Sequence, residues 1–287
     1  SRSAGTVTTL NLDRSAYHSC CTAVALDARG MFGRPTLLWM PILPSAAGLT
    51  LLVQLCKMGT TPERWFSPVA AASVRPSLVK RLATLYVVHA GRLFGSPIPS
   101  PEFVSGVELP VVAAALRQVL SRGQGCVIAC SPSSAARLAH FASHAQMDLS
   151  TVTFLTSGEP LTPAKFAEIE RSGADAMNLY AFAEGGVVGL GCAGGKSECD
   201  DVHLLEGSHA VIQRRRDVAY GGGQVDAFLF TTLHERAAKT LLNVESGDFG
   251  VSEVRHCGCG LEAAGLTRHL HTIRSFDKLT GEGMTFV

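Results

Sequence analysis

The sequence predicts an α/β fold: a mostly parallel sheet with flanking helices, plus a β-rich subdomain. Short apolar runs alternate with longer amphipathic segments before residue 190, which is the pattern of βα units. Beyond residue 191 helical patterns become sparse, glycines gather, and alternating strands such as 227–232 take over. We therefore predict an α/β region over 1–190, a β-rich subdomain over 191–272, and a separate segment over 273–287.

The elements of the α/β region follow from their residue patterns. Apolar runs at 37–42, 126–129 and 151–155 predict buried strands, and amphipathic segments at 48–58, 109–121 and 132–143 predict helices. Ser131 followed by Pro132 is typical of a helix start, because serine caps the free N–H groups and proline fits the first turn.

Two further elements bring polar residues to one edge of the sheet. A helix is expected from Pro163 to Arg171, with Gly173 ending it. A short strand at 178–180 would then deliver residues 180–184 to the carboxyl edge, where open α/β sheets bind their ligands.

Composition excludes several classes of protein. The chain has 287 residues, of which 46% are hydrophobic, so it can bury a sizeable core. Lys plus Arg total 25 and Asp plus Glu total 24, so no long-range attraction to nucleic acid or to an anionic membrane is expected. The uncharged run 35–56 approaches the length of a membrane span, but Pro41, Pro44 and Gly48 interrupt it. We predict a buried strand, a turn and a packed helix there, and no membrane span.

The chain has nine cysteines, which is an odd number, and several gather toward the C-terminal third. This usage favours a reducing cytoplasm and a metal site over a disulfide framework. Five cysteines in apolar surroundings are expected to be small core residues: Cys20, Cys21, Cys56, Cys126 and Cys130.

Three separated motifs indicate a nucleotide site. They are Thr156-Ser157-Gly158-Glu159-Pro160-Leu161, Asn178-Leu179-Tyr180-Ala181-Phe182-Ala183-Glu184-Gly185, and Ser246-Gly247-Asp248-Phe249-Gly250. Their order and spacing resemble the adenylate-forming enzymes, which activate carboxylic acids with ATP. The nearest branch is that of the phenylacetate–CoA ligases and the acyl-protein synthetases. The resemblance implies the fold of the large N-terminal domain of these enzymes.

The resemblance also implies roles for individual residues. Glu184 would hold Mg²⁺ as a hard carboxylate ligand, with Tyr180 beside the adenine and the acyl phosphate. Asp248 would accept hydrogen bonds from the ribose hydroxyls, since a carboxylate offers two acceptor oxygens. The adenine pocket would be formed by Ser157, Gly158, Glu159 and Pro160. Arg274 would precede the hinge to a small C-terminal domain, and Asp277 would be the hinge residue.

A phosphate loop is expected at the beginning of the chain. The resemblance assigns Ser3, Gly5 and Thr6 to it, because glycine and hydroxyl residues let donors approach phosphate oxygens. The loop departs from the family pattern S-S-G-T-T-G at Ala4, Val7 and Thr8. The chain also has Asn243-Val244-Glu245 where the family usually carries Arg-Tyr-Arg.

A structural zinc site is predicted in the β-rich subdomain. Cys199 and His203 form a C-x3-H pair, and Cys257 and Cys259 form a C-x-C pair, so the four together would close a tetrahedral site. Similar pairs occur in the branch named above. Alternate ligands, if the register differs, are Cys192 and His256.

The leading functional prediction is an AMP-forming acid–thiol ligase that uses ATP, Mg²⁺ and most readily coenzyme A. The alternative acceptors are a carrier protein or a protein cysteine, and a non-catalytic nucleotide- or partner-binding homologue is the second class of function. An aryl or acyl acid is expected, in a pocket near residues 180–186 and the segment 39–44. The acid itself and the oligomeric state, a homodimer included, stay open. The lysine-bearing C-terminal domain is expected in a longer form of the protein or in a separate chain.

Overall fold

The computed structural model describes residues 12–42, 45–68, 78–194, 198–218, 223–235, 237, 239–276, 279–281 and 284–286. Within these ranges the chain forms two compact units. One contains residues 31–156 and 164–176 and is called the parallel-sheet unit. The other contains residues 1–30, 157–163 and 177–287 and is called the β-rich unit. The units therefore interleave along the sequence, whereas the predicted regions were continuous.

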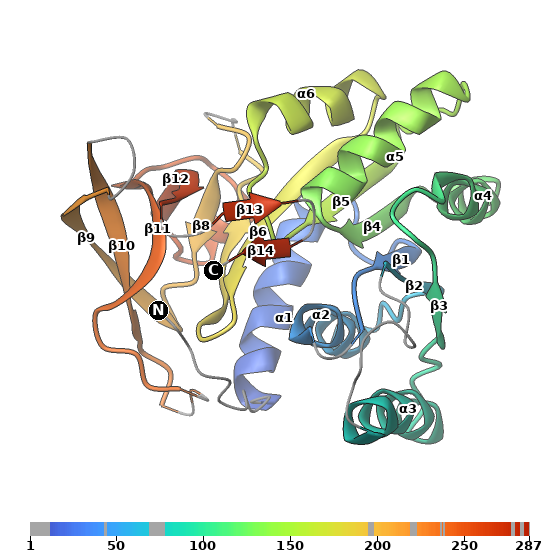
Figure 1. Ribbon diagram of the computed structural model, residues 1–287, viewed down its shortest axis with the longest axis horizontal. Coiled ribbons are helices and arrows are strands. Elements are labelled where there is room, and N and C mark those ends of the chain that lie inside the picture. Colours follow the sequence, from blue (N-terminus) through green and yellow to red (C-terminus); the bar gives the residue numbers. More distant parts are fainter. Residues whose placement is uncertain are drawn as a thin grey trace. The chain divides into compact units, whose positions relative to one another are not determined.

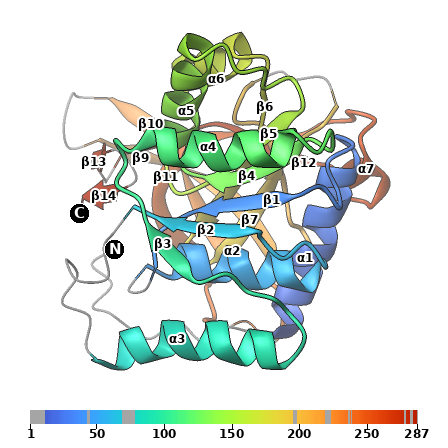
Figure 2. The same cartoon turned by 90° about the vertical axis from the view of Figure 1, so that its right-hand side faces the viewer.

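The parallel-sheet unit is built on five parallel strands in the order β3-β2-β1-β4-β5. The strands are β1 (Thr36–Trp39), β2 (Arg64–Ser67), β3 (Pro101–Phe103), β4 (Cys126–Cys130) and β5 (Val152–Thr156). The helices are α2 (Ala46–Lys57), α3 (Leu78–Leu93), α4 (Leu109–Leu120), α5 (Pro132–His144) and α6 (Pro163–Arg171). Figure 2 shows α4 on one face of these strands and α2 on the other. The mostly parallel sheet with flanking helices is as predicted.

The core of this unit explains its central strands. All five residues of β4 are buried, as expected for an interior parallel strand with helices on both faces. Trp39 and Trp65 are almost fully buried, and the Trp65 indole N–H donates to the Met40 carbonyl at 2.9 Å. Ser131 caps α5 by accepting from the Ser134 N–H, as its position before a proline predicts.

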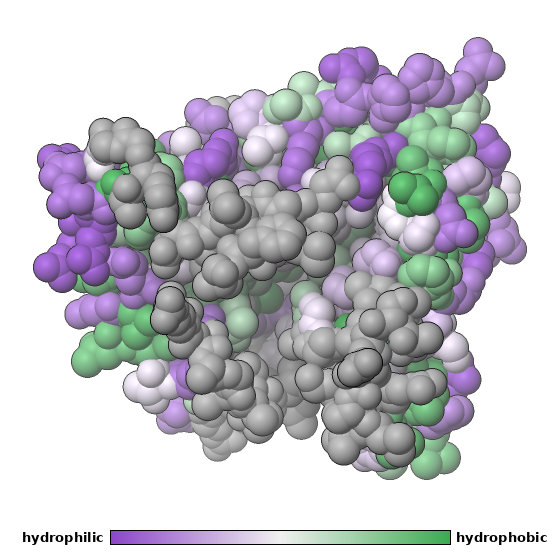
Figure 3. Space-filling view, in the orientation of Figure 1, coloured by the Kyte–Doolittle hydropathy of each residue, from purple (hydrophilic) through white to green (hydrophobic). Residues whose placement is uncertain are grey.

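The apolar run 35–56 forms β1 and α2, in agreement with the predicted strand and packed helix. None of the described helices combines the length and the hydropathy needed to cross a membrane. An apolar face on α3 stays exposed, with Leu82, Leu85, Tyr86 and Leu93 at helical spacing. Hydrophobic residues are visible where α3 lies, at the lower right of Figure 3.

The β-rich unit is an antiparallel sheet in the order β6-β7-β8-β12-β11-β10-β9 (Figure 1). Its strands are β6 (Asp175–Phe182, from residue 177 in this unit), β7 (Gly186–Gly191), β8 (Val202–Leu204), β9 (His209–Asp217), β10 (Gln224–Thr232), β11 (Val244–Val254) and β12 (Arg268–Ser275). A hairpin of β13 (Leu279–Gly281) and β14 (Met284–Phe286) follows. The expected short strand at 178–180 is thus longer, and it pairs antiparallel with β7.

Among the described residues of the β-rich unit, two segments are helical, α1 (Leu12–Asp27) and α7 (Gly260–Ala263), and they contact each other. The core of the sheet is Val188, Val202, Leu204, Phe228, Phe230, Leu270 and Ile273. Tyr180 and Phe182 pack against this core, and the rings of both contact Phe230. Among the five cysteines predicted to be core residues, Cys20 is exposed on α1 and Cys56 is only half-buried on α2, which corrects the prediction for these two.

Candidate nucleotide and metal sites

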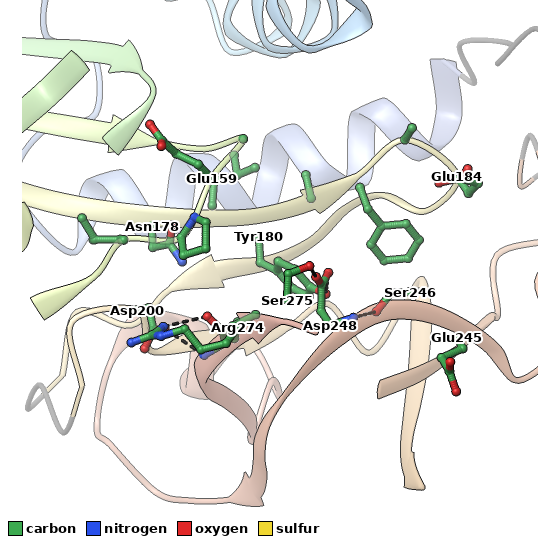
Figure 4. Close-up of a pocket in the computed structure, with 18 of the residues that line it drawn as sticks. Glu159, Asn178, Tyr180, Glu184, Asp200, Glu245, Ser246, Asp248, Arg274 and Ser275 are labelled. Atoms are coloured by element: carbon green, nitrogen blue, oxygen red, sulfur yellow. Dashed lines mark hydrogen bonds and ion pairs between the residues drawn. The ribbon is translucent and has the colours of Figure 1, made fainter. Parts of the chain in front are cut away.

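A cavity of about 360 Å³ lies in the β-rich unit (Figure 4), within the usual size range of small-molecule sites. Four separated segments of the chain line it: residues 158–161, residues 178–184, residues 244–248 without Gly247, and residues 273–275. Asp200 completes the lining. The three sequence motifs therefore meet at one cavity.

The structure places most of the predicted nucleotide-site residues at this cavity. Those lining it are Gly158, Glu159, Pro160, Tyr180, Glu184, Asp248 and Arg274. Ser157 is buried beside the segment without lining the cavity. Ser3, Gly5, Thr6 and Asp277 lie outside the described residues. Trp39, expected near the acid pocket, is a core residue of β1 in the parallel-sheet unit.

Asp248 is the centre of the hydrogen bonding in the cavity. The Tyr180 hydroxyl donates to Asp248 Oδ2 at 2.9 Å, and the Ser275 hydroxyl donates to Asp248 Oδ1 at 2.7 Å. Each carboxylate oxygen has two acceptor positions, so each keeps one for a further donor. The carboxylate is thus oriented by the protein and still able to accept two hydroxyl groups of a ligand.

Tyr180 is held in its protonated form. Burial of the hydroxyl, and then the neighbouring negative charge of Asp248, raise the pKa of Tyr180 above its ordinary value. The ring packs against Phe182 and Phe230, with centroid distances of 6.3 Å and 6.0 Å. The hydroxyl proton of Tyr180 is donated to Asp248, so what Tyr180 can offer a ligand is a fixed apolar ring face, and it is not suited to act as a base near neutral pH.

Glu184 lies at the turn between β6 and β7 and lines the cavity. Figure 4 shows it apart from Asp248, toward the end of β6. It is half-buried, and a single carboxylate in such a position fits a magnesium ion that also takes phosphate oxygens. Glu245 also lines the cavity, but its carboxylate accepts from Arg216 Nε at 2.6 Å, and Figure 4 shows it directed away from Asp248.

A cluster of metal-ligating side chains lies elsewhere in the β-rich unit. Cys192, His203, Cys257 and His269 bring four ligand atoms within 4.8 Å of one another. We call these four residues the Cys/His centre. The β8–β12 register pairs His203 with His269, and their ring centroids are 4.0 Å apart. The sheet register therefore joins ligands that are far apart in sequence.

Hydrogen bonds fix both imidazoles with Nε2 toward the centre. His203 Nδ1 donates to the Leu266 carbonyl at 2.8 Å, and His269 Nδ1 lies 2.9 Å from Asp201 Oδ1. His269 Nε2 is buried without a hydrogen-bond partner among the described residues. Burial, and then the neighbouring His269 ring, lower the pKa of His203 to about 4, so its imidazole is neutral at pH 7. Carbonyl and carboxylate partners of this kind orient metal-binding histidines.

The turn that carries Cys257 and Cys259 is shaped by glycines and by a carboxylate. Gly258 has a φ of +73°, which a glycine adopts without strain. A Cβ on Gly194 would lie 2.2 Å from the Cys257 carbonyl oxygen, so only glycine fits there. Glu262 accepts from the Cys257 and Gly258 N–H groups, and these bonds, with that of His256, lower the pKa of Glu262 to about 2.

This arrangement differs from the predicted ligand set. Cys199 Sγ donates to the Leu161 carbonyl at 3.2 Å and stands outside the centre, whereas Cys192, the alternate ligand, is inside it. Cys259 Sγ lies 3.2 Å from His203 Nε2, adjacent to the four. The other alternate, His256, is exposed and pairs with Glu262. Sequence reasoning missed His269, because its position opposite His203 depends on strand pairing.

The fold of this chain is similar to that of several solved structures. 2-Hydroxyisobutyryl-CoA ligase, solved with 2-HIB-AMP and CoA in the thioesterification state, matches with a TM-score of 0.58 and 16% identity, over 99% of this chain and 53% of that chain. The same ligase in the postadenylation state with R3-HIB-AMP matches with a TM-score of 0.56 and 16% identity, over 94% and 50% of the two chains. McyG A-PCP complexed with phenylalanyl-adenylate has a TM-score of 0.50 and 10% identity, over 98% and 48%.

The chain has the fold of adenylate-forming enzymes. This confirms the fold that the sequence resemblance implied. The chain spans about half the length of the solved structures it matches. No family model matches the sequence, and neither does any curated protein.

Two residues that line the cavity were not predicted to belong to the site. They are Ser275 and Asp200, and Asp200 is a buried carboxylate that accepts from Arg274 Nη1 at 2.8 Å. Asp200 lies between the cysteine and the histidine of the C-x3-H motif, and only those two flanking residues were predicted to be functional. Two adjacent acids before a buried strand were the signal that was available.

Proposed function

We propose that this chain carries the nucleotide-binding part of an enzyme that activates a carboxylic acid as an acyl adenylate and transfers it to a thiol. The supporting observation is the single cavity onto which Glu184, Asp248 and Arg274 converge from separate segments. The solved structures that share the fold hold acyl adenylates, and one of them holds CoA as well.

In this proposal Asp248 accepts the ribose hydroxyls with the two acceptor positions that Tyr180 and Ser275 leave free. Glu184 would hold Mg²⁺, which when bound neutralises phosphate charge. Arg274 would donate to the nucleotide, and Tyr180 would offer its ring face to the adenine. Gly158, Glu159 and Pro160 would line the adenine side of the cavity.

The proposed reaction has two steps. A carboxylate oxygen of the acid attacks the α-phosphorus of ATP, and pyrophosphate leaves with the electron pair of the broken P–O bond. A thiolate then attacks the acyl carbon, and AMP leaves. We propose coenzyme A as the thiol, because one solved structure that shares the fold holds CoA. We propose an uncharged aryl or acyl group on the acid, because Leu179, Ala181 and Phe182 give the cavity an apolar wall. The branch of phenylacetate–CoA ligases and acyl-protein synthetases is the proposed relationship within this fold.

Exchange of labelled pyrophosphate into ATP tests the first step. The protein is incubated with Mg²⁺, ATP, labelled pyrophosphate and a panel of aryl and acyl acids. The proposal expects exchange that requires both Mg²⁺ and one class of acid, and that Glu184→Gln reduces. Absence of exchange with every acid, in protein that binds AMP, would favour the second candidate.

The second candidate is a non-catalytic nucleotide-binding protein. It is favoured by one observation: Glu245, paired with Arg216, stands at the cavity within the segment where adenylate-forming enzymes usually carry Arg-Tyr-Arg. Under this candidate AMP binding requires Asp248, whereas Glu184→Ala leaves the biological activity unchanged.

We also propose that the Cys/His centre holds a structural zinc ion. The donor set of two thiols and two imidazoles suits tetrahedral zinc, and four protein ligands leave no position for a substrate. The unpartnered Nε2 of His269 and the orientation of both imidazoles fit such an ion. A reducing compartment such as the cytoplasm is proposed with it, because all nine cysteines are free thiols.

Metal analysis of the purified protein tests this centre. About one zinc per chain is expected, and Cys257→Ser and His269→Ala should lose it. Cys199→Ser is the matched control, because Cys199 lies outside the centre and should keep the metal. Loss of zinc from Cys199→Ser with retention in His269→Ala would instead support the ligand set that the sequence predicted.

A further inference from the structure

The strand that carries Arg274 contains a β-bulge. In the β11–β12 pairing Phe249 faces Arg274 and Val251 faces His271, so Thr272 and Ile273 together stand opposite Gly250. Side chains alternate between the two faces of a strand, and one extra residue moves every later side chain to the other face. The bulge therefore determines the face of the sheet on which Arg274 lies.

Gly250 and Thr272 show how tightly this bulge is built. A Cβ on Gly250 would meet the His271 carbonyl oxygen at 2.6 Å, so the two strands approach each other closely at this point. Thr272 has a φ of +54°, a conformation that β-branched residues rarely adopt. Such a backbone persists only where its surroundings hold it.

Asp200 stabilises this backbone conformation by accepting hydrogen bonds from its N–H groups. Its Oδ1 accepts from the Thr272 N–H at 2.9 Å, and its Oδ2 accepts from the Ile273 N–H at 2.8 Å. The same Oδ2 accepts from Arg274 Nη1 at 2.8 Å. Asp200 is only 2% exposed, so its charge is compensated by these three donors and not by bulk water.

Arg274 keeps donors for a ligand. Both of its hydrogen bonds, to Asp200 and to the Ile273 carbonyl, use Nη1. Nε and Nη2 donate to no described residue, and the side chain is 31% exposed at the cavity. Figure 4 shows Asp200 and Arg274 side by side at the cavity wall.

We infer that Asp200 is a positioning residue for nucleotide binding. It stabilises the bulge at Thr272 and Ile273 and clamps one nitrogen of Arg274, so that the remaining guanidinium donors face the nucleotide. This inference rests on the proposed function, since it assigns the cavity to a nucleotide. In this role Asp200 acts through Arg274.

A double-mutant cycle tests the inference, with AMP as the probe and calorimetry as the readout. Asp200→Asn keeps the side-chain shape and removes the charge. It should weaken AMP binding about tenfold, the equivalent of roughly 1.4 kcal/mol, and Arg274→Ala should have a similar effect. In the double variant the effects should not multiply, because Asp200 has nothing left to position.

Glu206→Gln is the matched control. Glu206 Oε2 accepts from the Thr267 and Arg268 N–H groups at 3.0 Å and 3.2 Å, so it too holds two successive amides of the β12 region. It does not line the cavity, and its variant should bind AMP as the wild type does. Equal weakening by Glu206→Gln and Asp200→Asn, or multiplied effects in the double variant, would overturn the inference.

Amide hydrogen exchange separates this inference from the proposed function, because it needs no ligand. Exchange at Thr272 and Ile273 should accelerate in Asp200→Asn and stay slow in Glu206→Gln. If the wild type binds no AMP, the proposed function fails, and accelerated exchange would still support the role of Asp200 in holding the bulge. Unchanged exchange at both amides would overturn that role, whatever the nucleotide result.

Discussion

Replacing Asp248 gives the sharpest prediction for the nucleotide cavity. Asp248→Asn keeps the size of the side chain and its place between Tyr180 and Ser275, but it removes the charge and one acceptor oxygen. A hydrogen bond to a charged group contributes about 1.5 to 3 kcal/mol. Loss of one such bond to the ribose should therefore weaken AMP binding roughly 10- to 100-fold.

The assay is calorimetric titration of AMP into the wild type and into the variant. A matched control lies three residues away on the same strand. Glu245→Gln removes the same charge from a residue that also lines the cavity, but its carboxylate pairs with Arg216 and should leave AMP affinity unchanged.

A second control changes the ligand. The wild type should bind 2′,3′-dideoxy-AMP more weakly than AMP, and Asp248→Asn should show a smaller difference between the two. Equal affinity of the wild type for both nucleotides, or equal loss in Asp248→Asn and Glu245→Gln, would refute the assignment of Asp248 to the ribose. Thermal unfolding of each variant checks that the cavity stays folded.

Three further predictions follow from the β-rich unit. Gly194→Ala should lower the free energy of unfolding by about 1 to 3 kcal/mol and reduce the amount of bound zinc, because the added Cβ would meet the Cys257 carbonyl oxygen. Gly223→Ala is the control: a Cβ there has open space, so stability and zinc content should stay unchanged. Thermal unfolding measures the stability, and metal analysis measures the zinc. Removing the metal with a chelator should weaken AMP binding in the wild type but not in Arg274→Ala, since β12 carries both His269 and Arg274; equal weakening in both would contradict this link. Burial, and then the nearby Cys21, raise the pKa of Tyr17 to about 12, so its contribution to stability should be complete below about pH 10 and lost as the pH rises to about 12. Urea unfolding across this pH range should show a loss of stability that is smaller in Tyr17→Phe. An identical loss of stability in the variant would show that Tyr17 is not its source.

Local sequence patterns predicted most elements of the parallel-sheet unit, but not β2, β3 or α3. The run at Cys126–Cys130 is a fully buried strand, and Ser131 with Pro132 begins the next helix as expected. These features depend on residues that are neighbours in sequence, such as an apolar run, a cap and a proline. The positions of Glu184 and Asp248 at one cavity followed from the family resemblance of their motifs.

The residues of the Cys/His centre could be predicted only in part. Spacing alone favoured Cys199 over Cys192, because Cys199 and His203 form a recognisable pair. In the structure the partner of His203 is His269, which lies opposite it across two antiparallel strands. Strand register over such a separation is set by the packed sheet, and no local pattern encodes it.

The bulge at Thr272 could not be predicted from the sequence either. A positive φ is usually signalled by glycine or asparagine, whereas here a threonine adopts it because Asp200, distant in sequence, accepts its N–H. The adjacent acids Asp200 and Asp201 diverge: one faces Arg274, and the other holds His269. The different partners of these two acids depend on the pairing of β8 with β12, which local sequence does not predict.

A crystal structure of the protein with AMP bound tests the proposed nucleotide site directly. AMP is expected in the cavity of the β-rich unit, with its ribose hydroxyls within hydrogen-bond distance of the Asp248 carboxylate and its phosphate directed toward Glu184. AMP bound elsewhere, or in this cavity with its ribose turned away from Asp248, would contradict the proposed site.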